Sequence, residues 1–200
     1  NPTLTQCATL SLCQLMCVSN GICDKYLALL FTSLSNVKDE ACRTTIMVAI
    51  GDLMSRFPNS LEAWTSYIYA RLCDDKTVVR YNALMVLTHM ILNDMIKVKG
   101  QVVNVVLCLT DPVDKICDLA KTLFIKLNER SNNPLFNLMS DIIGNISSKF
   151  SDKEKCGDKL LEGDDLEVAA LELKEVEGRR TLSFQEFITT VDFLISFIKN

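Results

Sequence analysis

The chain has 200 residues, of which 48% are hydrophobic and 23% charged, and its formal net charge is −4. This composition is enough for one sizeable core or several stacked repeats, and the charge excludes a strongly basic nucleic-acid-binding domain. No apolar stretch approaches the roughly 20 residues that span a bilayer, and no charged leader precedes an apolar segment, so we expect an interior piece of a longer soluble protein without a removable signal.

An internal repeat organises the first 150 residues. An offset of 37 residues aligns four columns of mostly apolar positions. Three columns lie one and four residues apart, which is the spacing of one buried helix face, and the fourth belongs to another helix. Each unit is therefore predicted to be two helices. The columns are Leu12/Ala49/Val86/Leu123, Cys13/Ile50/Leu87/Phe124, Met16/Leu53/Met90/Leu127 and Phe31/Ile68/Val105/Ile142.

The predicted helices follow one another with short joints. In chain order they are a lone second helix over 4–18, pairs at 23–35 with 39–56, 61–73 with 77–95 and 100–109 with 113–129, and a lone first helix over 134–147. Ser60 is the expected N-cap of the helix that it precedes. Asp111 is expected to cap a helix whose first position is Pro112, with Asp114 in its first turn, and Asn133–Pro134 repeats this arrangement.

A column of basic residues opens the second helices. Arg43 and Arg80 share it with Cys117, and acidic residues precede each position: Asp39 and Glu40, Asp74 and Asp75, and Asp111 and Asp114. This pattern resembles the HEAT repeat, in which an Asp/Arg ladder links neighbouring units. The resemblance implies an all-α HEAT-repeat α-solenoid, a right-handed superhelix of antiparallel helix pairs. A structural ladder is the favoured interpretation of the two arginines, and contact with a ligand is the alternative.

The stretch from Ile91 to Leu109 allows a phosphate-binding loop, a strand turn or a joint between helices. A phosphate loop needs a glycine-rich run that opens a helix, and a single glycine after two lysines does not meet this need. Gly100 suits the left-handed position after a helix, and Lys97 and Lys99 suit the negative end of its dipole. Val102–Leu109 is rich in β-branched residues, which favour strands. The segment nevertheless aligns in the 37-residue repeat with 65–72, which is predicted to be helical, so we expect a helix here as well.

The last fifty residues depart from the repeat. Residues 151–180 hold ten acidic and six basic residues and no aromatic residue. We expect a charged, flexible insertion over 151–182 between the solenoid at 1–150 and an amphipathic helix at 183–200, with one short helix near 166–177. A calcium loop at 152–163 is rejected because Cys156 and Gly163 occupy ligand positions.

The final helix is predicted by its start and its periodicity. Ser183 and Glu186 form a capping box, and apolar residues follow at helical spacing. Its polar face is not lysine-rich, which argues against a helix on a membrane surface. We expect it to continue or cap the solenoid, or to pack on residues beyond Asn200.

The sequence offers no recognisable catalytic or metal-binding set. Nine cysteines occur without closely spaced pairs, and His89 is the only histidine. Zinc sites usually use close cysteine pairs, and a Ser-His-Asp triad needs convergence that the sequence does not indicate. We therefore expect no enzyme, no cofactor and no metal, and cysteines that act mainly as buried free thiols in a reducing compartment.

Several longer strings carry a more specific resemblance. They are IGDLMSRFPN at 50–59 followed by Trp64, YARLCDDKTVVR at 69–80, LMVLTHMILNDMIKVKGQV at 84–102, DLAKTLFIKL at 118–127 and NPLFNLMSDIIGNIS at 133–147. Together they closely resemble the condensin subunit 1 family, the HEAT-repeat non-SMC subunits of condensin I. Residues 151–180 depart from this pattern.

The resemblance implies a scaffold that acts in mitotic chromosome condensation. Its implied partners are the SMC subunits and the kleisin of condensin, chromatin or DNA, and histones, with no small-molecule substrate and no membrane. The implied location is the nucleus and chromosomes, with a cytoplasmic pool outside mitosis. The alternatives are the related condensin II HEAT subunit and a HEAT adaptor of another class, such as a transport receptor or a phosphatase scaffold.

The candidate contacts with DNA or a partner protein are basic residues. They are Lys97 and Lys99 at the joint and Arg43 and Arg80 in the basic column. Exposed lysines at a joint suit contact with phosphate or an acidic surface. The alternative for the lysines is a solvated turn that compensates the helix dipole.

Overall fold

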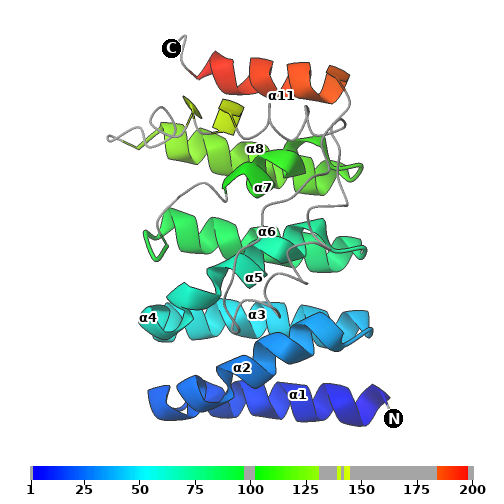
Figure 1. Cartoon of the computed structure of the whole chain (residues 1–200), viewed down its shortest axis with the longest axis vertical. Helices are drawn as coiled ribbons and strands as arrows, with labels where there is room; N and C mark the ends of the chain where they lie inside the picture. Colours follow the sequence, from blue (N-terminus) through cyan, green and yellow to red (C-terminus); the bar gives the residue numbers. More distant parts are fainter. Residues whose placement is uncertain (1, 97–101, 131–138, 141, 145–183, 198–200) are drawn as a thin grey trace, which may run out of the picture.

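The computed structural model describes residues 2–96, 102–130, 139–140, 142–144 and 184–197. Helices stack one above another in chain order along the long axis of the molecule (Figure 1). Their bounds are α1 Pro2–Met16, α2 Asn20–Asn36, α3 Glu40–Arg56, α4 Pro58–Leu61, η1 Glu62–Trp64, α5 Thr65–Ala70, η2 Arg71–Cys73, α6 Thr77–Leu92, α7 Val102–Val106, η3 Leu107–Thr110, α8 Asp114–Asn128 and α11 Phe184–Ser196. Across these ranges no residue forms a strand.

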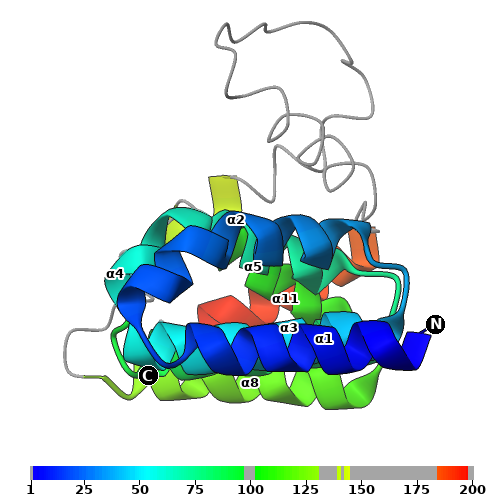
Figure 2. The same cartoon turned by 90° about the horizontal axis from the view of Figure 1, so that it is seen from below.

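The helices form two layers, as a stack of helix pairs requires. Seen from below, α1, α3 and α8 lie on one side, and α2, α4 and α5 lie on the other (Figure 2). The second helices pack successively, α1 on α3, α3 on α6, and α6 on α8. The predicted all-α HEAT-repeat solenoid is therefore confirmed.

The core follows the columns of the repeat. The columns that contain Cys13, Met16 and Phe31 are buried in every unit, with no side chain more than 3% exposed. The column that contains Leu12 is only partly buried, because Leu12 and Val86 lie at the edge of the core. A spacing of 37 residues thus brings the same helix face to the core in successive units.

The segments between the helices show where local propensity and tertiary structure compete. Val102–Leu109 is helical as predicted, forming α7 and most of η3, and Val105 is fully buried. The segment predicted as one helix over 61–73 is divided into short α and 3-10 pieces from Pro58 onward. At Val102–Leu109, packing of apolar side chains against the core therefore outweighs the β-propensity of the residues.

Two predicted N-caps are wrong. α4 begins at Pro58, so Ser60 lies inside it and donates its hydroxyl to Asn20 Oδ1 at 2.9 Å. α8 begins at Asp114 with Val113 as its N-cap, so Pro112 is not its first residue. Asp111 instead accepts the Val113 N–H at 3.0 Å in a turn before the helix.

Helix α11 lies on the end of the stack away from α1 (Figure 1). It contacts η3, and its Leu194 is fully buried in the common core. Phe193 and Phe197 pack edge to face with ring centroids 5.0 Å apart. Ser183 of the expected capping box and the expected insertion at 151–182 lie outside the described residues. Within those residues, no helix has the length and apolarity that crossing a bilayer requires.

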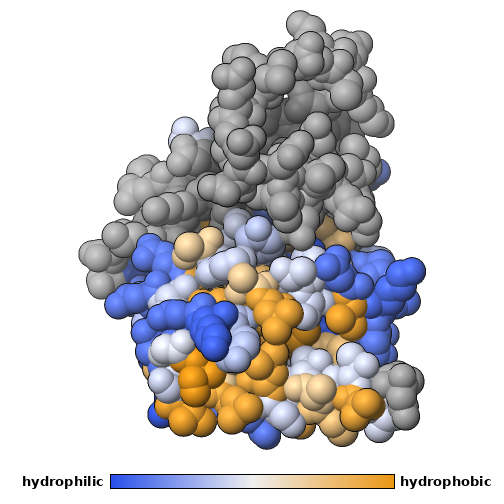
Figure 3. Space-filling model, turned by 60° about the horizontal axis from the view of Figure 1, so that its bottom comes forward, coloured by the Kyte–Doolittle hydropathy of each residue, from blue (hydrophilic) through white to orange (hydrophobic). Residues whose placement is uncertain are grey.

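The opposite end of the stack exposes several apolar side chains. Figure 3 brings this end forward and shows apolar side chains exposed among polar ones. Leu4, Val18 and Leu15 are 70%, 67% and 57% exposed, and all three lie in α1 or directly after it. The outer face of α1 is therefore partly apolar.

The cysteines of the described residues are free thiols, and half of these eight are buried. Burial raises the pKa of Cys13 and of Cys23 to about 11, above the ordinary 9.0. Each therefore supports the fold below pH 9 and loses that contribution as the pH rises through about 11.

We expect iodoacetamide at about pH 8 to label native protein first at Cys7, which is exposed, and to leave Cys13 and Cys23 largely unmodified, because only an accessible thiolate reacts. Peptide mass spectrometry of briefly labelled protein measures this order, and labelling in denaturant is the control. Equal labelling of Cys7 and Cys13 in native protein would contradict the burial of α1 against the core.

Candidate functional site

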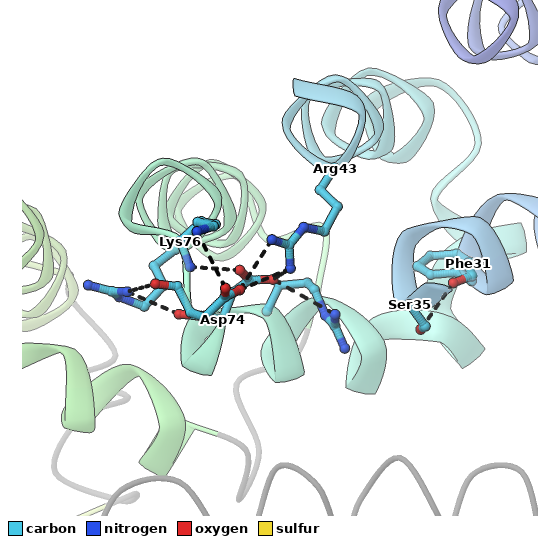
Figure 4. Close-up of polar contacts among 8 residues, drawn as sticks. Phe31, Ser35, Arg43, Asp74 and Lys76 are labelled. Carbon is cyan, nitrogen blue, oxygen red and sulfur yellow. Dashed lines mark hydrogen bonds and ion pairs between the residues drawn. The ribbon is translucent and has the colours of Figure 1, made fainter. Parts of the chain in front are cut away.

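One edge of the stack carries a ladder of ion pairs between neighbouring units, near the N-terminal ends of the second helices. Arg43 of α3 reaches the loop before α6 (Figure 4). Its Nη1 lies 2.8 Å from Asp74 Oδ2, and its Nη2 lies 3.2 Å from Asp75 Oδ1. The Arg43 side chain is 11% exposed and that of Asp74 is 1% exposed, so this link is largely buried.

Arg80 repeats the link one unit later. Its Nε and Nη2 bind the two carboxylate oxygens of Asp111 at 3.0 and 3.2 Å, which is a bidentate pair. Its Nη1 also donates to the carbonyl oxygens of Asp74 and Asp75 at 3.0 and 3.3 Å. One guanidinium therefore joins the loop before its own helix to the loop of the next unit.

The two aspartates that receive these arginines have the same local geometry. Asp74 Oδ1 accepts the Lys76 N–H at 2.9 Å, as Figure 4 shows, and Asp111 Oδ1 accepts the Val113 N–H at 3.0 Å. In each case Oδ1 fixes the turn and Oδ2 binds the arginine of the preceding unit, and Asp111 Oδ1 also accepts from Arg80. The turn thus holds the carboxylate in the orientation that the pair uses.

The ladder changes chemistry at both of its ends. In the first unit Gln6 occupies the arginine position, 37 residues before Arg43, and donates to Asp39 at 3.0 Å. In the last unit Cys117 occupies it and donates its thiol to the Asp111 carbonyl at 3.0 Å. The role of Gln6 was missed from the sequence, although extending the column by one unit upstream would have found it.

Burial and hydrogen bonding move the pKa values of the neighbouring carboxyls in opposite directions. Burial raises the pKa of Asp74, while the Lys76 N–H, Arg43 and Arg71 oppose this. The hydrogen bond with Asp74 lowers the pKa of Asp75, and Arg43 adds to that effect. Because the folded-state pKa of Asp75 is lowered, its link to Arg43 persists as the pH falls into the usual carboxyl range and is lost below it.

The structure places the four candidate contact residues differently. Arg43 and Arg80 are each 11% exposed and are paired with carboxylates, so the predicted structural ladder is present. Contact of these arginines with DNA or a partner stays a prediction, and it would compete with the ladder. Lys97 and Lys99 lie outside the described residues, as does Gly100.

A second link between units lies at the other ends of the second helices. α6 stops at Leu92 rather than at the predicted 95 and closes with two bonds, Met95 N–H to Met90 O at 2.9 Å and Asp94 N–H to Ile91 O at 3.2 Å. This is a Schellman motif, and Asp94 takes its left-handed position with φ of 56°. Arg130, just after α8, pairs with Asp94 Oδ1 at 2.6 Å and donates to the Leu92 carbonyl.

His89 does not belong to a catalytic triad in this part of the structure. Its Nε2 lies 3.5 Å from Ser55 Oγ, and its Nδ1 lies 3.1 Å from the Asn93 amide nitrogen. The residue that orients the ring is thus an amide rather than a carboxylate. Among the residues that the structure describes, no three His, Cys, Asp or Glu side chains converge as metal ligands would.

Comparison with known proteins adds the family. Residues 41–200 match the family described as non-SMC mitotic condensation complex subunit 1. The chain is similar to the Condensin-1 complex subunit CAP-D2 of Arabidopsis thaliana, with 43% identity over 154 residues, which are 77% of this chain and 11% of that protein.

Animal proteins are similar to the same degree. The Condensin complex subunit 1 of Mus musculus is 45% identical and that of Homo sapiens is 44% identical, each over 147 residues, which are 74% of this chain and 10% of each relative. The chain therefore spans about a tenth of the length of these curated relatives.

Proposed function

The chain belongs to the family of the non-SMC mitotic condensation complex subunit 1, and from this we propose that it forms part of a non-catalytic HEAT-repeat scaffold in condensin. The scaffold links the kleisin, the SMC heads and chromatin during mitotic chromosome condensation. Its place of action is the nucleus and the chromosomes, with a cytoplasmic pool outside mitosis. The family match over 41–200 is the observation that carries this proposal.

The architecture supports a scaffold role. Stacked helix pairs offer extended ridges that suit long partners, and each unit contacts mainly its neighbours. The buried pairs of Arg43 with Asp74 and of Arg80 with Asp111 fix successive units relative to one another. A stack held in this way presents surface residues of different units at fixed spacing, which a scaffold for several partners needs.

The partners of this scaffold are the SMC subunits and the kleisin, with DNA and histones as further contacts. The similar proteins are named as condensin complex subunits, which supports membership of such a complex. Full-length protein should purify with SMC and kleisin subunits of condensin I. Recovery with the other condensin, or with a transport receptor or phosphatase complex, would favour one of the alternatives.

Lys97 and Lys99 are the proposed contact with DNA phosphate or with an acidic partner surface. In full-length protein, the double reversal K97E/K99E should weaken DNA binding and flatten its salt dependence if the lysines meet phosphate, because each phosphate contact releases counterions. If they meet an acidic protein surface, recovery of SMC and kleisin subunits should fall while DNA affinity stays the same.

The matched control is the double reversal K115E/K126E, which changes the charge equally at two exposed lysines of α8. Fluorescence anisotropy with duplex DNA at several salt concentrations, and quantitative copurification, give the two readouts. Equal effects of both double reversals would show that net charge alone is responsible. No effect of K97E/K99E on either readout would remove the proposed contact.

A further inference from the structure

The second helices α1, α3 and α6 share a face that points away from the core. Its positions recur every three or four residues, opposite the buried column of Cys13, Ile50 and Leu87, and each is exposed or half-exposed. The layer with α2, α4 and α5 lies on the other side (Figure 2). This second-helix face consists of Leu4, Ala8, Ser11, Leu15 and Val18 from α1 and the turn after it, Ala41, Thr45, Val48, Asp52 and Ser55 from α3, and Val78, Asn82, Met85 and His89 from α6.

The second-helix face is largely apolar and nearly without charge. It contains no lysine and no arginine, and Asp52 is its only acidic residue. The polar face of a surface helix usually carries charged side chains, so contact with water does not explain this composition. Its large apolar side chains are each 45% to 70% exposed, namely Leu4, Leu15, Val18, Val48, Val78 and Met85.

Helix α8 shows that the repeat does not require an apolar residue at these positions. In the 37-residue register Lys115 of α8 stands at the position of Val78, and Thr122 stands at the position of Val48 and Met85. α8 still packs on α6 and still buries its own core column. Valine also has a lower helix propensity than lysine. The exposed valines therefore contribute neither to the core nor to the stability of their helices.

The chemistry of the second-helix face fits a protein rather than a nucleic acid or an anionic membrane. Phosphate groups and anionic lipids are bound by lysine and arginine, which this face lacks. Exposed apolar side chains gain from contact with other apolar side chains, which removes both from water. Methionine is common on surfaces that bind helices, because its flexible side chain adapts to the partner, and Met85 lies at the centre of α6.

The spacing on α3 and α6 fits a helix as the partner. Ala41 and Val48 are seven residues apart on α3, and Val78 and Met85 are seven residues apart on α6. Seven residues of a helix span about 10 Å. Packed helices lie about 8–10 Å apart, so these four side chains stand at the corners of a square of about that size. A helix that lies along α3 and α6 presents its residues i, i+3 or i+4 and i+7 at the same spacing.

We infer that the second-helix face, centred on Val48 and Met85, docks an amphipathic helix of another protein subunit of condensin. This inference rests on the proposed function, which supplies the complex. The apolar stripe of the partner helix covers the side chains on α3 and α6, and the charged side chains of α8 lie beyond its edge.

The first test identifies what lies on the face. Full-length protein assembled with the SMC and kleisin subunits carries the photo-crosslinking residue benzoylphenylalanine in place of Met85, or in place of Thr122 as the matched position on α8. Mass spectrometry identifies the crosslinked peptides. Position 85 should join to a peptide of another subunit that has apolar residues at helical spacing, and position 122 should not. Crosslinks from position 85 to DNA, to a second copy or to the same chain, or none at all, would overturn the inference.

The second test measures affinity. Met85→Asp should raise the Kd of full-length protein for the purified SMC–kleisin subassembly by about tenfold or more, because it places an unpaired charge in an apolar contact. Met85→Leu should bind as the unchanged protein does. Thr122→Asp adds the same charge at the equivalent position of α8 and should leave the Kd within about twofold. Equal unfolding midpoints for the two aspartate variants control for misfolding, since both positions are exposed.

The outcomes separate this inference from the function on which it rests. Equal Kd values for M85D and T122D would overturn the docking of a helix on this face and leave membership of the complex standing. Unchanged protein that does not bind the SMC–kleisin subassembly would remove the proposed function and the inference with it.

Discussion

Replacement of Asp111 by alanine is expected to destabilise the fold by about 3 kcal/mol, because it leaves the Arg80 guanidinium largely buried without its anion. The Asp111 side chain is fully buried and binds Arg80 through both oxygens, at 3.0 and 3.2 Å. It also holds the turn before α8 through the Val113 N–H. The loss is measured as a lower midpoint in urea unfolding followed by circular dichroism.

Two further variants make this result specific. Asp118→Ala removes an acidic residue of α8 that is 73% exposed, and it should change stability by less than about 0.5 kcal/mol. Replacing Arg80 and Asp111 together by apolar residues of similar size should recover part of the loss, since no buried charge is then unpaired. Equal midpoints for D111A and D118A would show that the ladder does not hold the units together.

Phe124→Ala is expected to lose about 4 kcal/mol, within the range for removing a buried aromatic side chain. Phe124 is fully buried and lies in the column shared by Cys13, Ile50 and Leu87. Ile125 is the next residue and is 43% exposed, so Ile125→Ala should lose less than about 1 kcal/mol. The two variants differ by one position in the register, and unfolding midpoints and chevron slopes compare them directly.

Both changes remove a large apolar side chain from the same helix. A difference between the two variants therefore reports which face of α8 meets the core. If Ile125→Ala proved the more damaging, the face of α8 that meets the stack would be other than the one that the 37-residue columns define. An equal and small loss for both would mean that α8 adds little to the folded core.

The periodic features of this fold could be read from the sequence, because they depend on spacing alone. Three of the four columns are buried in every unit, and the acidic residues before the next position of the basic column supply the partners of Arg43 and Arg80. The helical state of Val102–Leu109 also followed from register, against local propensity. A pattern that recurs at fixed intervals carries more information than any single window.

The features that escaped prediction depend on which of two partners a side chain takes. Aspartate is a common N-cap residue, but the carboxylate of Asp111 binds Arg80 and the Val113 N–H in the turn before α8. An aspartate does not indicate a left-handed position in the sequence as a glycine would, and the partner of Asp94, Arg130, lies 36 residues away. Such choices are settled by tertiary contacts, which local sequence does not encode.

The chemistry of the ladder also has a mechanical consequence. Links that join successive layers bear a pulling force in series, so separation begins where a link is weakest. The links of Arg43 and Arg80 are ion pairs with two or more bonds each, whereas Gln6 joins α1 to Asp39 by one bond from an uncharged amide, and the thiol of Cys117 bonds only within its own unit. An ion pair with several bonds between arginine and carboxylate is stronger than a single bond from a neutral donor. Under tension along its axis this stretch should therefore yield first between α1 and α3, while the layers joined by Arg43 and Arg80 move as one stiff block.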